Sequence, residues 1–173
     1  MQDIYFISDM HFGHSNIIKY ENRPFKNIKE MDATIIKNWN SVVKKDDKVF
    51  VLGDISFYDK EKTAEIIYSL NGYKVLILGN HDNERSLHWW KSVGFDEVIN
   101  YSIIYNDFYI LSHEPMYLND NMPYMNIHGH IHNLKYESKQ FFNVSVECID
   151  YTPISFEKIK EDVVSKMKLE ELK

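Results

Sequence analysis

Short apolar runs alternate with segments of helical periodicity through the first half of the chain. The apolar runs are four residues long, which suits buried strands, and the periodic segments are long enough for helices. The strands are expected at 4–7, 49–52 and 75–78, and the helices at 28–43, 60–70 and 84–91. Alternation of strand and helix predicts βαβ units with parallel strands.

The second half of the chain has a different pattern. Strands are expected at 98–105, 108–112, around 125–127 and at 141–148, followed by a helix at 155–166 and a charged helical tail at 166–173. Asn106 and Asp107 form a hairpin turn between the first two of these strands, and Ser155 is a suitable N-cap. We therefore predict one α/β domain over residues 1–173, parallel at first and then increasingly antiparallel. Its strands form a mixed sheet or two packed sheets with helices outside.

Composition excludes several classes of protein. The chain has 173 residues, of which 44% are apolar, and this is enough for a folded core. A single cysteine, Cys148, excludes a disulfide framework and a cysteine-based zinc site. The start of the chain lacks signal-peptide features and its apolar runs are too short to span a bilayer, so we expect a cytoplasmic protein. The formal net charge of −6 argues against binding of extended nucleic acid.

Polar, metal-binding residue types follow five predicted strands in turn. They are Asp9 and His11, then Asp54, then Asn80 with His81 and Asp82, then His113, and finally His128, His130 and His132. In α/β sheets, ligands bind beyond the carboxyl ends of the strands. Asp and Asn also form turns and caps, and a histidine-rich stretch can be a solvated loop. Five such strand ends in order are hard to explain by capping, and they indicate a metal site.

The residue types narrow the choice of metal. Imidazole mixed with carboxylate suits manganese, iron, zinc, cobalt or nickel, and the sequence does not choose among them. Seven residues are candidate ligands: Asp9, His11, Asp54, Asn80, His113, His130 and His132. One tetrahedral or five-coordinate ion needs fewer. Two ions about 3.5–4 Å apart that share Asp54 would use all of them.

These residues resemble the signature of the calcineurin-like metallophosphoesterase superfamily, which reads DxH, GD, GNH[D/E], a histidine and GHxH. Here the blocks read DMH at 9–11, GD at 53–54, GNHD at 79–82, His113 and GHIH at 129–132. The resemblance covers nearly the whole chain and implies a four-layer α/β/β/α sandwich of two packed, mixed sheets. The chain resembles a small, single-domain bacterial or phage-type member. It departs from the protein phosphatase branch, because GDISFY stands where that branch has GDxVDRG.

The resemblance also implies roles for the residues in a phosphoesterase with two divalent metal ions. Asp9, His11, Asp54 and His132 would hold the first ion, and Asp54, Asn80, His113 and His130 the second. A hydroxide that bridges the ions would attack phosphorus in line. His81 would protonate the leaving oxygen as general acid, and Asp82 would orient His81 and keep it charged. The alternative for His81 is a further metal ligand. His128 lies outside the signature and is expected to support the fold or the ligands.

The sequence gives weaker indications about the substrate. His14, Arg23 and Arg85 lie near the motifs and are candidate phosphate contacts, although a surface or packing role is the commoner one for each of them. Two divalent ions, two ligand carboxylates and one hydroxide leave a net charge of about +1, which suits a phosphodiester at least as well as a monoester. We therefore expect a phosphodiesterase acting on a small nucleotide or cyclic nucleotide, with manganese supporting activity in vitro.

Three alternatives differ from this expectation. A phosphomonoesterase acting on a phosphorylated metabolite or nucleotide would use the same centre. A non-catalytic scaffold could keep the fold without catalysis. A single-zinc hydrolase would use only some of the seven candidate ligands, and the chain lacks the helical HExxH pattern of such enzymes. The native metals, the oligomeric state and the pathway stay open.

Overall fold

The computed structural model describes residues 2–119 and 121–171, with 166–171 given by their backbone alone. The described strands form two sheets. The first contains, in spatial order, β4 (Glu97–Ile99), β3 (Tyr73–Ile77), β2 (Lys48–Val51), β1 (Ile4–Ile7) and β9 (Ile154–Ser155). The second contains β5 (Ile103–Tyr105), β6 (Tyr109–Leu111), β7 (Met125–His128) and β8 (Phe141–Asn143). The prediction of two packed, mixed sheets with helices is confirmed.

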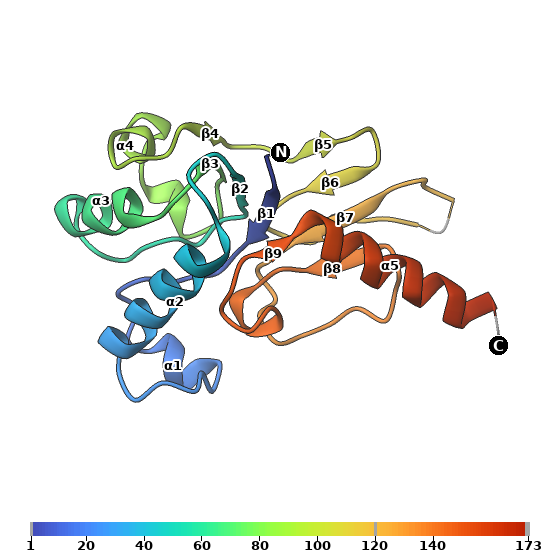
Figure 1. Cartoon of the computed structure of the whole chain (residues 1–173), viewed down its shortest axis with the longest axis horizontal. Coiled ribbons are helices and arrows are strands. Elements are labelled where there is room, and N and C mark those ends of the chain that lie inside the picture. Colours follow the sequence, from blue (N-terminus) through green and yellow to red (C-terminus); the bar gives the residue numbers. More distant parts are fainter. Residues whose placement is uncertain (1, 120, 172–173) are drawn as a thin grey trace.

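The helices lie on the two sides of these strands. They are α1 (Ile17–Tyr20), α2 (Ile28–Val42), α3 (Lys60–Ser69), α4 (Leu87–Ser92) and α5 (Phe156–Glu171), with short 3₁₀ turns at Asp82–Glu84 and Val146–Cys148. In Figure 1, α2, α3 and α4 lie to one side of the strands and α5 to the other. Asn27, Asp59 and Ser86 begin α2, α3 and α4 by accepting a backbone N–H three residues on. These side-chain caps satisfy backbone donors that the helix itself leaves free.

Alternation along the central strands divides the apolar residues between two cores. Ile7, Val51 and Leu76 pack against α2, α3 and α4, in a core that includes the fully buried Trp39 and Trp90. Phe6, Phe50 and Ile77 point the other way and pack against the second sheet, with Phe156 and Ile159 of α5. Both faces of the first sheet are therefore buried, which explains why its strands read as continuous apolar runs.

Pairing confirms the predicted βαβ units and corrects the second half. β1, β2, β3 and β4 pair in parallel. The hairpin is confirmed, since β5 and β6 are antiparallel and Asn106 and Asp107 both have positive φ. The expected shift toward antiparallel pairing is confirmed for β9, which pairs antiparallel with β1, but it is wrong between these elements, because β6 pairs with β7, and β7 with β8, in parallel.

Several predicted boundaries were also wrong. The strand expected at 98–105 is two strands, because the chain leaves the first sheet after β4 and enters the second at β5. The helix expected at 84–91 begins only after Ser86, which caps α4. The strand expected at 141–148 ends at Asn143 and continues as an isolated bridge and a 3₁₀ turn. The last helix extends to Glu171, and Leu172 and Lys173 of the expected tail lie outside the described residues.

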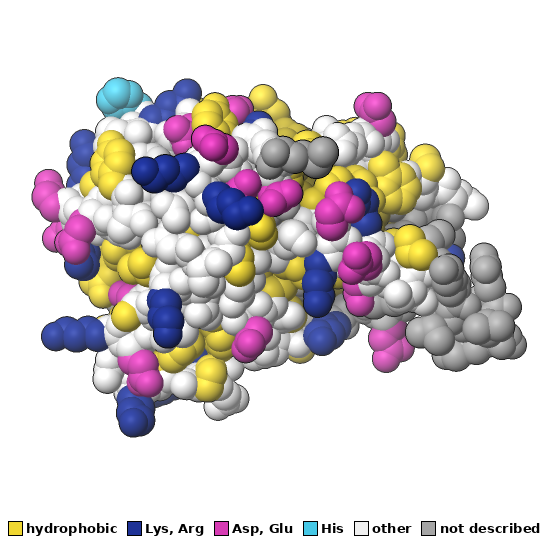
Figure 2. Space-filling model, in the orientation of Figure 1, with side chains coloured by type: hydrophobic (Ala, Val, Ile, Leu, Met, Phe, Trp, Pro, Cys, Tyr) yellow, Lys and Arg dark blue, Asp and Glu magenta, His cyan; other side chains and the backbone are white. Residues whose placement is uncertain are grey.

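Two further features concern membrane-spanning helices and surface charge. Among the described helices, none combines the length and the apolar character needed to cross a membrane. On the face in Figure 2, acidic and basic side chains are interspersed. This face therefore mixes both signs of charge rather than presenting one.

Candidate metal centre

The candidate ligands meet where the carboxyl ends of five strands converge. They are Asp9 and His11 after β1, Asp54 after β2, Asn80 after β3, His113 after β6, and His130 and His132 after β7. Parallel pairing aligns the ends of β1, β2 and β3 in one sheet and of β6 and β7 in the other. Packing of the two sheets then brings these ends together, as His113 Nδ1 donating to Leu52 O and His130 N donating to Asp9 Oδ2 show.

Asp54 lies between two groups of these residues. Its Oδ2 is 3.5 Å from His11 Nε2, and its Oδ1 is 3.6 Å from His113 Nε2. On the first side, Asp9, His11 and His132 offer ligand atoms that all lie within 4.8 Å of one another. On the second side, His113 Nε2 is 2.9 Å from Asn80 Oδ1 and 3.2 Å from His130 Nδ1. The structure therefore gathers the seven candidate ligands around Asp54, while Asp9 also lies close to Asp54 and His113, and their division between two ions stays a prediction.

These separations suit ligands of divalent cations. Two nitrogen or oxygen ligands about 2.1 Å from one tetrahedral ion are about 3.4 Å apart. The 3.2 Å between His113 and His130, and the 3.5 and 3.6 Å from Asp54 to His11 and His113, are close to that value. The side chains therefore need little movement to bind divalent cations.

Burial gives an independent reason for cations here. Asp9, His11 and Asp54 are at most 2% exposed, yet Asp9 Oδ1 and both ring nitrogens of His11 have no hydrogen-bond partner. Unpaired buried polar groups are costly. Burial also raises the pKa of Asp54 to about 6 and lowers the pKa of His11 well below its usual range. A bound cation would lower the pKa of Asp54 again. The low pKa of His11 keeps its ring neutral, which is the form that binds metal.

Hydrogen bonds fix which ring nitrogens face the centre. His113 Nδ1 lies 2.7 Å from Leu52 O, and because a carbonyl only accepts, this nitrogen carries the proton. His132 Nδ1 lies 3.1 Å from Glu147 Oε1. Nε2 is therefore the ring nitrogen left to bind a metal in each, an arrangement common among metal-binding histidines, and in His113 it lies among the candidate ligands Asn80 and His130.

The backbone at the site is in a rarely populated conformation. Five candidate ligands have left-handed φ: Asp9 at 58°, His11 at 52°, Asp54 at 56°, His130 at 70° and His132 at 48°. Each such residue costs about 1–3 kcal/mol, and conformations of this kind cluster at functional sites. At Gly53, φ is 84°, and an added Cβ would lie 2.6 Å from His113 Nδ1. The close approach of the ligands therefore requires glycine there.

A model of the calcineurin-like phosphoesterase family matches residues 3–170. The chain belongs to this family. Membership implies metal-dependent hydrolysis of phosphoesters, and the clustered Asp and His residues fit that chemistry.

Relatives are small proteins from several sources. An uncharacterized protein of Methanocaldococcus jannaschii, MJ1445, is 41% identical over an alignment that covers 92% of this chain and 90% of the relative. The gene 66 protein of Mycobacterium phage L5 is 40% identical over 51% of this chain and 44% of its own length. The crystal structure of AQ665 from Aquifex aeolicus, a protein of unknown function, superimposes with a TM-score of 0.73 and 29% identity. The superposition covers 93% of this chain and 99% of AQ665.

His81 lies at the exposed mouth of the candidate metal centre. Its side chain is 49% exposed, and Nε2 is 4.0 Å from Asp54 Oδ2. His81 N donates to Asp54 Oδ1, which fixes the backbone of the residue beside the centre. An exposed ring at this place can reach a bound substrate.

The predicted role of Asp82 is not supported by its contacts. Its carboxylate accepts hydrogen bonds from the backbone N–H groups of Asp54, Ile55 and Gly79, at 2.8–3.1 Å. Asp82 is 1% exposed. The carboxylate therefore holds the loops after β2 and β3 together. Its hydrogen bonds go to backbone amides and not to the His81 ring.

The two arginines also have other partners than a substrate. Arg23 is 4% exposed, and its guanidinium donates to Asp9 O, Met10 O and Glu147. Arg85 donates to Ser56 O and Tyr58 O and stacks on Trp89 at 4.1 Å. Arg23 is therefore too enclosed to contact phosphate as predicted, whereas Arg85 holds the 56–58 loop and its contact with phosphate stays a prediction.

His14 and His128 have different neighbours. The His14 ring is 5.6 Å from the His11 ring, so this residue stays a candidate substrate contact. His128 is 1% exposed on β7 and lies against Tyr136 and Phe141. This place agrees with the expectation that it supports the fold.

Sequence reasoning missed a row of polar residues that support the ligands. Asn143 Nδ2 donates to His132 O, Ser145 Oγ donates to Asp9 Oδ2, and Glu147 pairs with His132. Burial alone would raise the pKa of Glu147, but His132 and the charge of Arg23 hold it below its usual value. The signal was present in the polar, apolar alternation of NVSVE at 143–147, which places all three residues on one side.

Replacing Glu147 with Gln is expected to weaken metal binding about 10- to 100-fold, because His132 loses the carboxylate that orients it. Metal affinity measured by titration of the metal-free protein checks this. Glu61→Gln, an exposed glutamate on α3, is the matched control and should leave the affinity unchanged. Unchanged affinity in both variants would contradict the role of Glu147.

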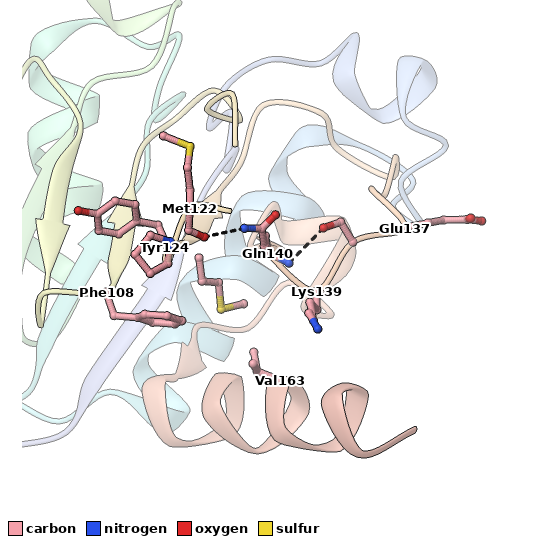
Figure 3. A pocket seen from close by; sticks show the side chains of 10 residues that line it. Phe108, Met122, Tyr124, Glu137, Lys139, Gln140 and Val163 are labelled. Atoms are coloured by element: carbon pink, nitrogen blue, oxygen red, sulfur yellow. Dashed lines mark hydrogen bonds between the residues drawn. The ribbon is translucent and has the colours of Figure 1, made fainter. Parts of the chain in front are cut away.

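A separate hollow lies at the far end of the second sheet. It measures about 520 Å³ and is lined by Phe108, Met122, Gln140 and Val163, among others (Figure 3). Gln140 Nε2 donates to Met122 O across one wall. The hollow lies at the start of β7, whereas the histidine cluster follows its end, so we do not assign it to the metal centre.

Proposed function

We propose that this chain hydrolyses phosphodiesters of small molecules at a centre of two divalent cations, with His81 as the general acid. The position of Asp54 supports this most strongly. Its two oxygens face His11 on one side and His113 on the other, each at 3.5–3.6 Å. A carboxylate so placed can be shared by two ions, the arrangement used for in-line displacement at phosphorus.

The roles of the side chains follow from their positions. Asp9, His11, Asp54 and His132 would hold one ion, and Asp54 with Asn80, His113 and His130 would hold the other. When bound, the two ions neutralise charge on the phosphoryl oxygens and activate a water molecule. His81, exposed at the mouth, donates a proton to the leaving oxygen, because an alkoxide leaves poorly without one.

The surroundings of the centre favour a diester over a monoester. A hollow of about 230 Å³ adjoins Asn80 and His113 and is lined by polar residues including Asn83, Asn100 and Glu114. On the other side of Asp54, the exposed ring of Phe57 lies beside His11. A diester has two organic substituents, and in this proposal the hollow receives one of them while the other lies against Phe57. The small net positive charge expected of the loaded centre also suits a singly charged phosphodiester.

Metal-free protein is expected to be inactive, and added manganese to restore hydrolysis of bis(4-nitrophenyl) phosphate. We expect kcat/KM for this diester to exceed that for 4-nitrophenyl phosphate. Release of 4-nitrophenolate and elemental analysis of the loaded protein measure both effects. A faster monoester would indicate a phosphomonoesterase, and two bound ions without hydrolysis of any phosphoester would indicate a scaffold.

A further inference from the structure

Three aromatic side chains form a strip that leads from solvent to the metal centre. Its members are Tyr20 on α1, His14 and Phe57, and we call them the aromatic strip. Ring centroids are 6.2 Å apart between Tyr20 and His14, and 4.4 Å apart between His14 and Phe57, whose rings are stacked. Tyr20 is 67% exposed and Phe57 is 42% exposed. The strip therefore presents ring surface to solvent.

The inner end of the strip contacts residues of the centre. The Phe57 ring lies 5.5 Å from the His11 ring and 5.2 Å from the His81 ring. His11 is a candidate ligand and His81 the proposed general acid. A substituent on the leaving oxygen that His81 faces would therefore lie close to Phe57.

The segment that carries Phe57 is held firmly. Phe57 N donates to Phe12 O at 2.8 Å, and the residues on both sides of Phe57 accept hydrogen bonds from the Arg85 guanidinium through Ser56 O and Tyr58 O. Arg85 is itself stacked on Trp89 at 4.1 Å. An exposed phenyl ring fixed in this way is preorganised for binding, because no loop ordering is needed.

We propose that the aromatic strip binds the planar aromatic group of the substrate by stacking, and that this group is a nucleobase on the leaving-group arm. The proposal rests on the phosphoesterase function proposed above and names its substrate class. Aromatic side chains stack on any base, since every base has a π face. His14 fits the same role, because its ring is stacked on Phe57 at 4.4 Å and its Nδ1 has no hydrogen-bond partner.

Another reading of Phe57 is that it only shields His11 from water. That reading predicts that a change at Phe57 alters metal affinity and affects every substrate equally. Stacking predicts an effect only on ligands that carry a base. The ratio between a ligand with a base and one without it therefore separates the two readings.

The test compares adenosine monophosphate with ribose 5-phosphate, which lacks the base, as competitive inhibitors of the manganese-loaded enzyme. The inhibition constants should differ about 5- to 140-fold in favour of the nucleotide, as stacking of one base implies. Phe57→Leu should bring this ratio close to one, and Tyr20→Leu should lower it without disturbing the fold, because Tyr20 is exposed. Phe108→Leu is the matched control, since Phe108 is 41% exposed and directly precedes β6, at the end of that strand away from the centre.

A second readout does not depend on activity. Adenosine added to metal-free protein should shift the NMR signals of the Phe57 and Tyr20 rings, and ribose should not. A wild-type inhibition ratio near one, or the same change in Phe57→Leu and Phe108→Leu, would overturn the aromatic strip as a binding site. Failure of the loaded protein to hydrolyse any phosphoester would instead reject the proposed function, and the NMR result would still decide whether the strip binds a base.

Discussion

Replacing Asp54 with Asn is expected to abolish metal-supported hydrolysis and to reduce the metal content below two ions per chain. The amide has nearly the shape of the carboxylate but carries no charge and has only one acceptor oxygen. Asp54 faces His11 with one oxygen and His113 with the other, so the change removes a ligand from both sides of the centre. Elemental analysis and a chromogenic diester assay measure the two effects.

The control for Asp54 is another buried aspartate. Asp32 is 7% exposed on α2 and accepts a hydrogen bond from Tyr58 Oη, outside the centre. Asp32→Asn makes the same chemical change and should keep both ions. If Asp54→Asn bound two ions with wild-type affinity, Asp54 would not be shared between them, and the proposed centre would be wrong.

Replacing His81 with Ala is expected to lower kcat at least about a hundredfold while the metal content stays near that of the wild type. This is the usual size of general acid catalysis. His81 is half-exposed at the mouth, and its backbone N–H rather than its ring is bonded to Asp54, so removal of the ring leaves the ligands in place. The loss should be larger for an alkyl ester than for a 4-nitrophenyl ester, because 4-nitrophenolate leaves without a proton.

The comparison of leaving groups separates general acid catalysis from metal binding. His88→Ala, at an exposed histidine of α4, should change neither turnover nor metal content. Loss of one ion in His81→Ala would identify His81 as a metal ligand. An equal loss for alkyl and 4-nitrophenyl esters would show that the ring does not supply the proton.

The corrected residues share a physical reason. Asp82 and Arg23 were assigned from their charge and their closeness to motifs in the sequence. In the structure Asp82 accepts hydrogen bonds from the backbone amides of Asp54 and Ile55, and Arg23 forms an ion pair with Glu147. A charged group in a folding chain takes the partner that satisfies it when buried, and that partner can be far away in sequence. Local spacing does not contain this information.

The strand predicted at 98–105 failed for a related reason. An apolar run shows that a segment is buried, but it does not show which sheet buries it. The chain changes sheets between Ile99 and Ile103, and only the packing of the two sheets separates β4 from β5.

The sequence by itself determined the family, the kinds of elements and the strand ends at which the candidate ligands stand. This was possible because strand and helix periods are local, and because parallel strands present their carboxyl ends at one edge. Only the tertiary structure decided the partners of Asp82, Arg23 and Glu147, and the exposure of Phe57 beside His81. Such contacts join distant segments, and they depend on how two sheets pack rather than on any local pattern.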